Sequence, residues 1–349
     1  MKNPKNKSSR AEAGFAHVML FLVLVFVCAV IAFAGYTVYK QHSTTSTKPL
    51  QHVTVQLNWL NNAQYTGLYT AVQKGYYKAA GLEVSFKEVG TDTDPLQEID
   101  KGTADYAIST PLEVVLARDK GETVTAVAAM EQTSPYAIAS RAEANIKTPA
   151  DFAGKVLGGS GGNPEAAVTY AVLLTSAGLK PSDATIKNVD FDVVKVFQDK
   201  QSDTVDLYRT DQPYLYKQQN IAYNLIYPED FGFNIYGDVL AATDSKIAKN
   251  KDQVAAFVQA SMKGWGYAID HQSEALGYVA KYQNSLYKDT AYERYILSNM
   301  APLIKPSGGH VLGTMQYIPW NRAYQGVQAA GLLKHPYDAT KLYTSKFIE

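Results

Sequence analysis

The stretch VTVQLNWLNNAQYTGLYTAV, residues 53–72, decides the fold class. Apolar side chains occupy every second position from Val53 to Trp59, which is the pattern of a half-buried strand. Apolar residues then recur at helical spacing from Leu68 onward, and Gly75 ends that pattern. The segment therefore predicts a strand followed directly by a helix, the repeating unit of α/β folds.

The same alternation of short apolar strands and amphipathic helices continues along the chain. A first series is expected up to residue 129 and a second one after the polar segment 141–151. Alternation of this kind predicts mostly parallel sheets with helices on both faces. The expected strands cover 82–86, 106–108, 124–129, 155–158, 189–194, 205–208, 224–226 and 239–242, and the expected helices cover 95–101, 112–119, 164–176 and 214–219.

Two such series in one chain predict a two-lobed α/β protein. We expect residues 53–140 to begin the first lobe, residues 141–235 to form the second, and residues 236–349 to return to the first. Helices with one apolar face, near 254–269, would pack on the first lobe after that return.

The crossing segments near 138–146 and 232–240 would form the hinge of a cleft between the lobes. In open α/β sheets, ligands bind beyond the carboxyl ends of the strands, and small molecules often bind where two lobes meet. The loops that follow the strands are therefore the places in which binding residues are expected.

The N-terminal segment predicts a membrane anchor. Residues 1–14 carry Lys and Arg, residues 15–39 are almost wholly apolar, and residues 40–52 form a polar tether rich in Ser and Thr. About 20 apolar residues suffice to span a bilayer as a helix, and positive charge before the span keeps the N-terminus in the cytoplasm. The alternative is a signal peptide cleaved after Ala34. On either interpretation the folded part lies outside the cytoplasm.

Charge and composition exclude several kinds of site. Five of 33 Lys and Arg residues lie in residues 1–40, against one of 33 Asp and Glu residues, so the body is mildly acidic. It lacks the basic footprint of nucleic-acid binding. The single cysteine, Cys28, permits no internal disulfide. The histidines show no HExxH spacing, and no GxxxxGKS loop occurs. We therefore expect neither a metal nor another cofactor.

The loop after the first strand is the first candidate binding loop. It supplies two aromatic rings and three carboxamides, which suit a flat solute that stacks on a ring and is hydrogen-bonded at its edge. The alternative is that Asn62 only caps the helix and Trp59 lies in the core. The candidate residues are Trp59, Asn61, Asn62, Gln64 and Tyr65.

Two further loops join a strand to a helix. Ser109 and Thr110 precede Pro111, so hydroxyl groups and free N–H groups of the helix start could receive a polar or anionic group, although capping alone explains Thr110 equally well. The loop 158–165 holds four glycines, more than a turn requires, and Asn163 and Pro164 are strong helix-start signals. Its candidate binding residues are Ser160, Gly161 and Glu165.

The predicted second lobe contributes one more loop. Tyr208 ends the expected strand 205–208, and Asp211 and Gln212 follow it, so these three side chains could face the cleft. Three residues elsewhere complete the predicted ligand-binding set, namely Glu113, Gln132 and Tyr236.

An enzyme hypothesis comes from the glycine-rich loop. Gly158, Ser160 and Gly162 match the nucleophile elbow of α/β-hydrolases, and the strand–turn–helix context agrees with it. A hydrolase would need an Asp and then a His later in the chain, for which His271 and His310 are available. A lone histidine at the end of an amphipathic helix is more often structural, so this esterase remains the alternative.

Several segments, in order, carry a resemblance to a known family. They are NWLNNAQYTGLY at 58–69, KGYY at 74–77, GLEV at 81–84, DYAIS at 105–109, TPADFAGK at 148–155, VAAF at 254–257, GWGYA at 264–268 and YTSKF at 343–347. Together they resemble the solute-binding proteins of ABC importers, in the group for thiamine-pyrimidine precursors, sulfonates and nitrate. The resemblance covers residues 53–349.

This resemblance implies a type II periplasmic-binding fold whose two lobes close on a ligand, with a permease and its cytoplasmic ATPase as partners. The opening motif is most similar to the pyrimidine-precursor branch, whose ligands are flat heteroaromatics. Where that branch commonly has His before Thr-Gly, this chain has Tyr65. The superfamily includes a fungal enzyme with a cysteine-rich active site, and nothing here supplies those cysteines.

The expectation from the sequence is therefore a carrier and not an enzyme. It would be a monomeric solute-binding protein of an ABC importer, tethered to the cell membrane, with its N-terminus cytoplasmic and its binding lobes extracytoplasmic. It would capture a small heteroaromatic or polar solute, with a thiamine pyrimidine precursor favoured. A surface receptor or scaffold without transport is the other alternative.

Overall fold

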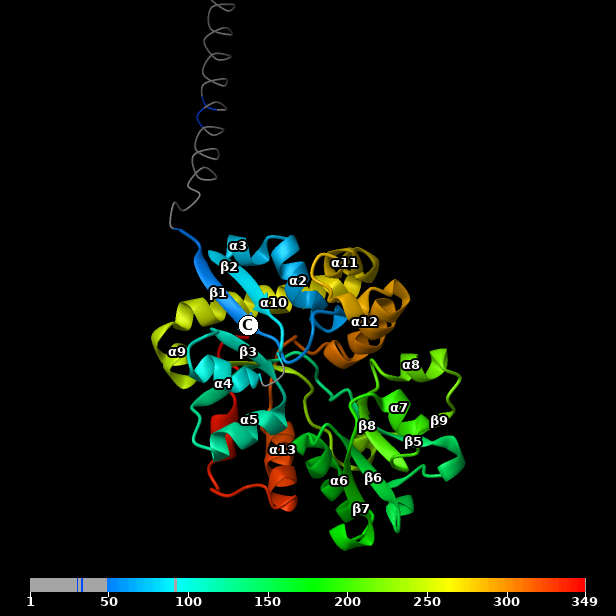
Figure 1. The fold of residues 1–349 in the computed structure, drawn as a ribbon. Coiled ribbons are helices and arrows are strands. Elements are labelled where there is room, and N and C mark those ends of the chain that lie inside the picture. Colours follow the sequence, from blue (N-terminus) through cyan, green and yellow to red (C-terminus); the bar gives the residue numbers. More distant parts are fainter. Residues whose placement is uncertain (1–29, 31–32, 34–48, 91–92, 349) are drawn as a thin grey trace, which may run out of the picture. The chain divides into compact units, whose positions relative to one another are not determined.

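The computed structural model describes Val30, Phe33, residues 49–90 and residues 93–348, and the chain from Leu50 onward forms one compact unit (Figure 1). The predicted basic tail 1–14 lies outside the described residues, as do nearly all of the predicted anchor 15–39 and most of the tether 40–52. Among the residues that are described, no helix has both the length and the apolar character needed to cross a membrane.

The first lobe is built on a five-stranded sheet with the order β2-β1-β3-β10-β4. β1 pairs in parallel with β2 and β3, whereas β10 runs antiparallel to both β3 and β4. The strands are β1 (Gln51–Gln56), β2 (Leu82–Lys87), β3 (Tyr106–Ser109), β4 (Val124–Ala129) and β10 (Val239–Thr243). The helices between them are α2 (Thr66–Gln73), α3 (Tyr76–Ala79), α4 (Pro95–Asp100) and α5 (Pro111–Asp119), with the 3-10 turn η1 (Ala63–Tyr65) before α2.

The second lobe repeats this plan with the strand order β7-β6-β8-β5-β9. β6 pairs in parallel with β7 and β8, and β5 runs antiparallel to β8 and β9. Its strands are β5 (Tyr136–Arg141), β6 (Val156–Ser160), β7 (Thr185–Val189), β8 (Thr204–Tyr208) and β9 (Tyr223–Ile226). Its helices are α6 (Pro164–Ser176), α7 (Val193–Gln198) and α8 (Pro213–Gln218), with 3-10 turns at Ala142–Ala144, Pro149–Phe152, Pro181–Asp183 and Pro228–Phe231.

In each sheet the antiparallel strand in fourth place is the one that arrives from the other lobe. β5 follows β4 of the first sheet, and β10 follows β9 of the second. The two crossing segments, 130–135 and 227–238, lie side by side: Met130 N donates to Asp238 O at 2.8 Å and Ser134 N donates to Ile235 O at 2.9 Å. We call this pair of connecting segments the hinge.

Two predicted elements differ from the structure. Residues 136–141 form β5 inside the second sheet, so the first crossing precedes the predicted segment 138–146 and the second sheet begins before residue 141. The strand predicted at 189–194 is instead the end of β7 followed by α7, because the Asp192 side chain accepts hydrogen bonds from Val194 N and Lys195 N and starts a helix there.

The inner strands of each sheet are buried on both faces. Tyr106 and Ile108 of β3 point into a core with α2 and α10 (Lys251–Asp270), and Ala107 between them points into a core with α5 and α13 (Tyr317–Ala329). In β5, Ile138 and Ala139 likewise face opposite cores. The sheets are thus sandwiched between helices, as the alternating pattern predicts.

The C-terminal third completes the first lobe. The predicted apolar face of α10 is buried against α2, where Gly67 and Gly264 allow close approach: a Cβ on Gly264 would lie 2.8 Å from the Ala71 Cβ. α13 contacts both α5 and α6, so it packs on both lobes. The remaining elements are α9 (Asp244–Lys249), α11 (Gln272–Val279), α12 (Thr290–Ile304) and the 3-10 turns Ser285–Tyr287 and Ala339–Leu342.

Candidate ligand-binding site

A cavity of about 240 Å³ lies between the two lobes. Most of its walls come from residues at or just beyond the carboxyl ends of the parallel strands β1, β3, β6, β7 and β8. The first lobe contributes Asn58, Trp59, Gln64, Thr110 and Glu113, and the second contributes Tyr136, Ser160, Asn163, Glu165, Phe191, Val193, Asp206, Leu207, Tyr208, Asp211 and Gln212.

The structure brings eight of the predicted binding residues together in this cavity: Trp59, Gln64, Thr110, Glu113, Ser160, Glu165, Tyr208 and Asp211. They come from both lobes and from each of the candidate loops. The loops that follow the strands therefore lie at the cavity.

Three predicted residues of the first loop do not line the cavity, because their side chains hold the loop itself. The Asn61 side chain accepts a hydrogen bond from Tyr69 Oη at 2.6 Å. Asn62 is the helix cap, accepting from Gln64 N at 2.8 Å, which is the alternative stated for it above. Tyr65 is fully buried and donates to Asn58 Oδ1 at 2.6 Å.

Four more predicted residues are also outside the lining. Ser109 is buried and donates to Glu113 at 2.7 Å. Gln132 donates to Thr314 O, and Tyr236 Oη accepts from Gln316 N, so both are engaged with the C-terminal segment. Gly161 has a φ of +58°, and a Cβ there would overlap the Phe191 ring. The absence of a side chain at Gly161 therefore lets the Phe191 ring pack against the backbone.

Gln212, expected to face the cleft, also lines the cavity, whereas the prediction missed Asn58, Tyr136, Phe191, Val193, Asp206 and Leu207 and used Asn163 only as a cap. Phe191 is the most informative of these because 65% of its side chain is exposed while it lines the cavity. An aromatic residue between two acids, Asp190 and Asp192, is a sequence signal for an exposed ring. The mistaken strand at 189–194 hid it.

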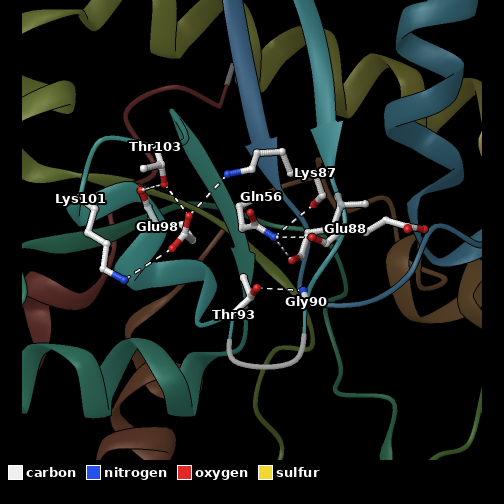
Figure 2. A network of polar contacts seen from close by, with 9 residues as sticks. Gln56, Lys87, Glu88, Gly90, Thr93, Glu98, Lys101 and Thr103 are labelled. Atoms are coloured by element: carbon white, nitrogen blue, oxygen red, sulfur yellow. Dashed lines mark hydrogen bonds and ion pairs between the residues drawn. The ribbon is translucent and has the colours of Figure 1, made fainter.

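Trp59 is held at the cavity wall by its surroundings. Its Nε1 donates to Tyr287 Oη at 2.7 Å, and its side chain is 37% exposed. The buried Gln56 amide donates to the carbonyl oxygens of Leu57, Lys87 and Glu88, tying the ends of β1 and β2 together (Figure 2). Glu88 in turn accepts from Asn61 N at 2.7 Å. This network fixes the start of the loop that carries Trp59.

The edge of the first sheet has a second polar cluster beside this network. Glu98 on α4 accepts a hydrogen bond from Thr103 Oγ1 at 2.6 Å and pairs with Lys87 and Lys101 at 3.5 and 3.6 Å (Figure 2). The pKa of Glu98 is lowered, first by the Thr103 hydroxyl. These exposed pairs join α4 to β2 and do not line the cavity.

The cavity lining is acidic. In the part of the chain that the structure describes, it includes four carboxyl groups, from Glu113, Glu165, Asp206 and Asp211, and no Lys, Arg or His. Burial raises the pKa of each of the four, that of Asp211 to about 6. Such a cavity favours hydrogen-bond donors and disfavours negative charge.

The helix starts at the cavity are already capped by the protein itself. Glu113 accepts hydrogen bonds from Thr110 N and Ser109 Oγ, and Thr110 Oγ1 accepts from Glu113 N, which completes a capping box. Asn163 accepts from Glu165 N at the start of α6. The anion receptor that the sequence suggested at Ser109 and Thr110 is therefore filled by a carboxylate of the same chain.

Ser160 is engaged with an aspartate. Its hydroxyl and its N–H both donate to Asp206 Oδ1, at 2.8 and 2.6 Å, and Tyr136 Oη donates to the other oxygen at 2.6 Å. Because no histidine lines the cavity in the described part of the chain, the base that the esterase hypothesis needs is not in place beside Ser160.

The hinge is connected to the cavity through Asp238. Its carboxylate accepts hydrogen bonds from Asn58 Nδ2 at 2.9 Å and Gln64 Nε2 at 2.6 Å, and its N–H donates to Glu131 Oε2 at 2.6 Å. Burial raises the pKa of Asp238 to about 7 and that of Glu131 in the same direction. Two cavity residues are thus anchored directly on the hinge.

The two sheets, their strand orders and the cavity between them give the chain the mixed α/β fold of periplasmic binding proteins. The aliphatic sulphonate binding protein SsuA of Escherichia coli has the same fold, with a TM-score of 0.66 over 84% of this chain and 97% of that one, at 14% sequence identity. A likeness at this identity shows the fold alone.

Sequence relatives give the family. The family model described as NMT1/THI5 like matches residues 62–275, more than half of the chain, so the chain belongs to the NMT1/THI5-like family. The riboflavin-binding protein RibY of Chloroflexus aurantiacus is 27% identical over 307 residues, 86% of each chain. The formylaminopyrimidine-binding protein of Halalkalibacterium halodurans is 25% identical over 258 residues, 73% of this chain and 77% of that one.

Proposed function

We propose that this protein is the solute-binding component of an ABC importer and carries a flat heteroaromatic solute between its two lobes. The observation that supports this most strongly is the cavity itself, which is walled by both lobes and has an aromatic ring from each, Trp59 and Phe191. The names of the two relatives, one for riboflavin and one for a formylaminopyrimidine, indicate the same ligand chemistry.

The ligand would stack on Trp59 or Phe191 and be hydrogen-bonded at its edge by the polar side chains of the cavity. Gln64, Thr110, Asp206 and Gln212 offer both donors and acceptors there. Because the residues come from both lobes, the ligand binds the closed arrangement better than the open one, and this difference drives closure. On closure the second lobe would bring Ser160, Glu165, Tyr208 and Asp211 to the ligand.

In this role the lobes lie outside the cytoplasm. Residues 15–39 anchor the protein in the membrane, and the tether 40–52 connects that anchor to the first lobe. A permease and its cytoplasmic ATPase would receive the solute from the closed form. The protein acts as a monomer and performs no chemistry on the solute, in keeping with the partners that Ser160 has in the cavity.

A binding screen on the full chain tests this function. Riboflavin, 4-amino-5-hydroxymethyl-2-methylpyrimidine, its N-formylated relative and an aliphatic sulfonate are each added during thermal unfolding. A ligand at about 100 times its Kd stabilises the folded state by about 2.7 kcal/mol. We expect at least one heteroaromatic to raise the Tm saturably. If none of them does, and a surface partner is bound instead, the scaffold alternative is favoured.

A further inference from the structure

Residues 284–293, which lead into α12 and form its first turn, contact both walls of the cavity. Tyr287 accepts a hydrogen bond from Trp59 of the first lobe, and Tyr292 donates one to Asp211 of the second. In the described part of the chain, neither tyrosine belongs to the cavity lining. An inference about these tyrosines rests on the proposed function and extends it to side chains that the solute does not reach.

Tyr287 sets the direction of the Trp59 ring. An indole has one hydrogen-bond donor and no acceptor, and this donor of Trp59, Nε1, lies 2.7 Å from Tyr287 Oη. Trp59 is partly exposed whereas Tyr287 is buried, so the tyrosine is the better fixed of the two. One hydrogen bond shifts the balance between two ring orientations by roughly two- to tenfold. Without it, the Trp59 ring would adopt more than one orientation at the cavity wall.

The backbone before Tyr287 is held to the loop that carries Trp59. Asn284 N donates to Asn61 O at 2.8 Å, and the Asn284 side chain donates to Glu88 at 3.1 Å. These contacts lie within the first lobe and fix the place at which the Tyr287 side chain is attached. The position of the Tyr287 ring itself depends on the side chains that pack on it.

Tyr292 packs on the Tyr287 ring and also touches the second lobe. The centroids of the two rings lie 5.6 Å apart. Tyr292 donates to Asp211 and stacks on Tyr214 of α8, and Leu215 beside Tyr214 packs against the core of the first lobe. If the lobes separated, Tyr292 would lose the hydrogen bond and the stacking together. The Tyr287 ring would then lose the support of a neighbour with a fixed position.

The charge of Asp211 confirms how closely the second lobe approaches these groups. Burial and then Asp211 raise the pKa of the Tyr287 hydroxyl. Burial also raises the pKa of Glu293 to about 8, and Asp211 adds to that effect. Glu293 accepts a hydrogen bond from Ala63 N, in the same loop as Trp59. One side chain of the second lobe is therefore near two groups that hold the first cavity loop.

We propose that Tyr287 is a positioning residue that links the Trp59 ring to the contact between the lobes: while Tyr292 is bound to Asp211, the Tyr287 hydroxyl holds the Trp59 ring in one orientation at the cavity wall. Closure of the lobes thereby prepares the surface on which the solute stacks. Separation of the lobes releases the ring, so the solute meets a fixed ring only when the second lobe is in place.

The indole N–H signals of the ligand-free full chain, measured by heteronuclear NMR, test this link without any solute. The chain has three tryptophans, and Trp59→Phe identifies the signal of Trp59. Tyr287→Phe should move the Trp59 proton signal upfield, because the hydrogen bond is lost. Tyr292→Phe keeps both tyrosine rings and removes only the hydroxyl that donates to Asp211. We expect it to move or broaden the Trp59 signal as well.

Two controls show that such a change is specific. Trp265 and Trp320 are fully buried, so their signals should stay in place in every tyrosine variant and report that the fold is kept. Tyr278→Phe removes a hydroxyl that bonds to Glu274 within α11, and it should leave the Trp59 signal unchanged. A role of Tyr287 in stability alone would lower the Tm without making the Trp59 signal depend on Tyr292.

Binding of riboflavin and of 4-amino-5-hydroxymethyl-2-methylpyrimidine, measured by calorimetry, extends the test to the solute. Tyr287→Phe should raise the Kd about threefold or more. Because Tyr287 and Tyr292 act through one link, the loss of affinity in the double variant should be smaller than the product of the two single losses. Losses that simply multiply, or a Trp59 signal that Tyr292→Phe leaves unchanged, overturn the proposal while the carrier function stands. If no compound of the thermal screen binds, the proposed function fails, and the ligand-free spectra still decide whether the link exists.

Discussion

Tyr292, on α12 of the first lobe, donates a hydrogen bond to Asp211, which lines the cavity from the second lobe. Tyr214 on α8 makes a second contact between the lobes: its ring stacks on Tyr292 with centroids 4.8 Å apart, and its hydroxyl donates to Asp289, the cap of α12, at 2.8 Å. These tyrosines therefore hold the lobes together beside the cavity. A ligand that contacts Asp211 would lie next to the hydrogen bond between Tyr292 and Asp211.

Removing the Tyr292 hydroxyl is predicted to weaken ligand binding. Tyr292→Phe keeps the stacking on Tyr214 and deletes only the hydrogen bond to Asp211. A hydrogen bond to a charged group contributes about 1.5–3 kcal/mol, so we expect a Kd at least tenfold higher by titration calorimetry. Tyr295→Phe is the control, because its hydroxyl makes only a 3.4 Å contact with Arg209 O. Equal affinities for the two variants would show that the contact plays no part in closure.

Phe191 is predicted to contribute binding free energy and almost no stability. Its ring is mostly exposed, so Phe191→Ala should change the free energy of unfolding by less than about 0.5 kcal/mol. Loss of a stacking ring should weaken the binding free energy by about 1–3 kcal/mol, by analogy with stacking of nucleic-acid bases. Ile186→Ala, at a half-exposed position on β7, is the control for affinity. An unchanged Kd for Phe191→Ala would show that this ring does not contact the ligand.

A pH dependence of stability is predicted from Glu293. This buried carboxyl on α12 accepts from Ala63 N at 2.5 Å, and burial raises its pKa to about 8. The folded state therefore holds a proton that the unfolded chain has lost between about pH 4.5 and 8, so this group makes stability fall as pH rises through that range. Asp211 and Asp238 act in the same direction, with pKa values of about 6 and 7.

The variant Glu293→Gln isolates the contribution of that carboxyl. Its side chain cannot ionise and still accepts from Ala63 N. Between pH 5 and 8 the free energy of unfolding of the wild type should fall by roughly 1–3 kcal/mol more than that of the variant, since one pKa unit corresponds to about 1.4 kcal/mol. Denaturant titrations at several pH values measure this. Parallel curves for the two proteins would contradict the assignment.

The packing of α10 on α2 is predicted to tolerate no side chain at Gly264. A Cβ there would overlap the backbone of α2 at Gly67, whereas a Cβ at Gly266 would lie 3.5 Å from Leu312, an ordinary contact. Gly264→Ala should destabilise the protein by about 1–3 kcal/mol or more. Gly266→Ala, two residues along the same helix, should be neutral or slightly stabilising. Comparison of the Tm values of the two variants with that of the wild type tests this prediction.

Local patterns in the sequence predict much of the fold. The alternation at residues 53–57 and the Asn163-Pro164 helix start each mark an element that the structure contains. β5 was not predicted, because a short strand of small apolar residues beside a crossing segment reads equally well as a linker. The Asp192 cap decides between strand and helix in α7, but the apolar run around it hid that signal.

The candidate site is predictable in place and less so in detail. The carboxyl ends of the strands locate the cavity because parallel strands end at one edge of a sheet. Which side chains enter it depends on competing partners far away in sequence. The Asn61 side chain bonds to Tyr69, and the Tyr65 hydroxyl bonds to Asn58. Asp206 lies inside a strand, yet it lines the cavity, where Tyr136 and Ser160 donate hydrogen bonds to it. No local pattern reports such contacts.

Tryptophan fluorescence tests the central claim most directly, because the three tryptophans differ in position. Trp265 and Trp320 are fully buried, and Trp59 lines the cavity. A heteroaromatic that stacks on Trp59 should quench part of the emission saturably, at the Kd found by calorimetry. In Trp59→Phe that quenching should disappear while weaker binding remains. The same quenching in Trp59→Phe, or saturable binding that leaves the emission of the wild type unchanged, would contradict a ligand site between the lobes at Trp59.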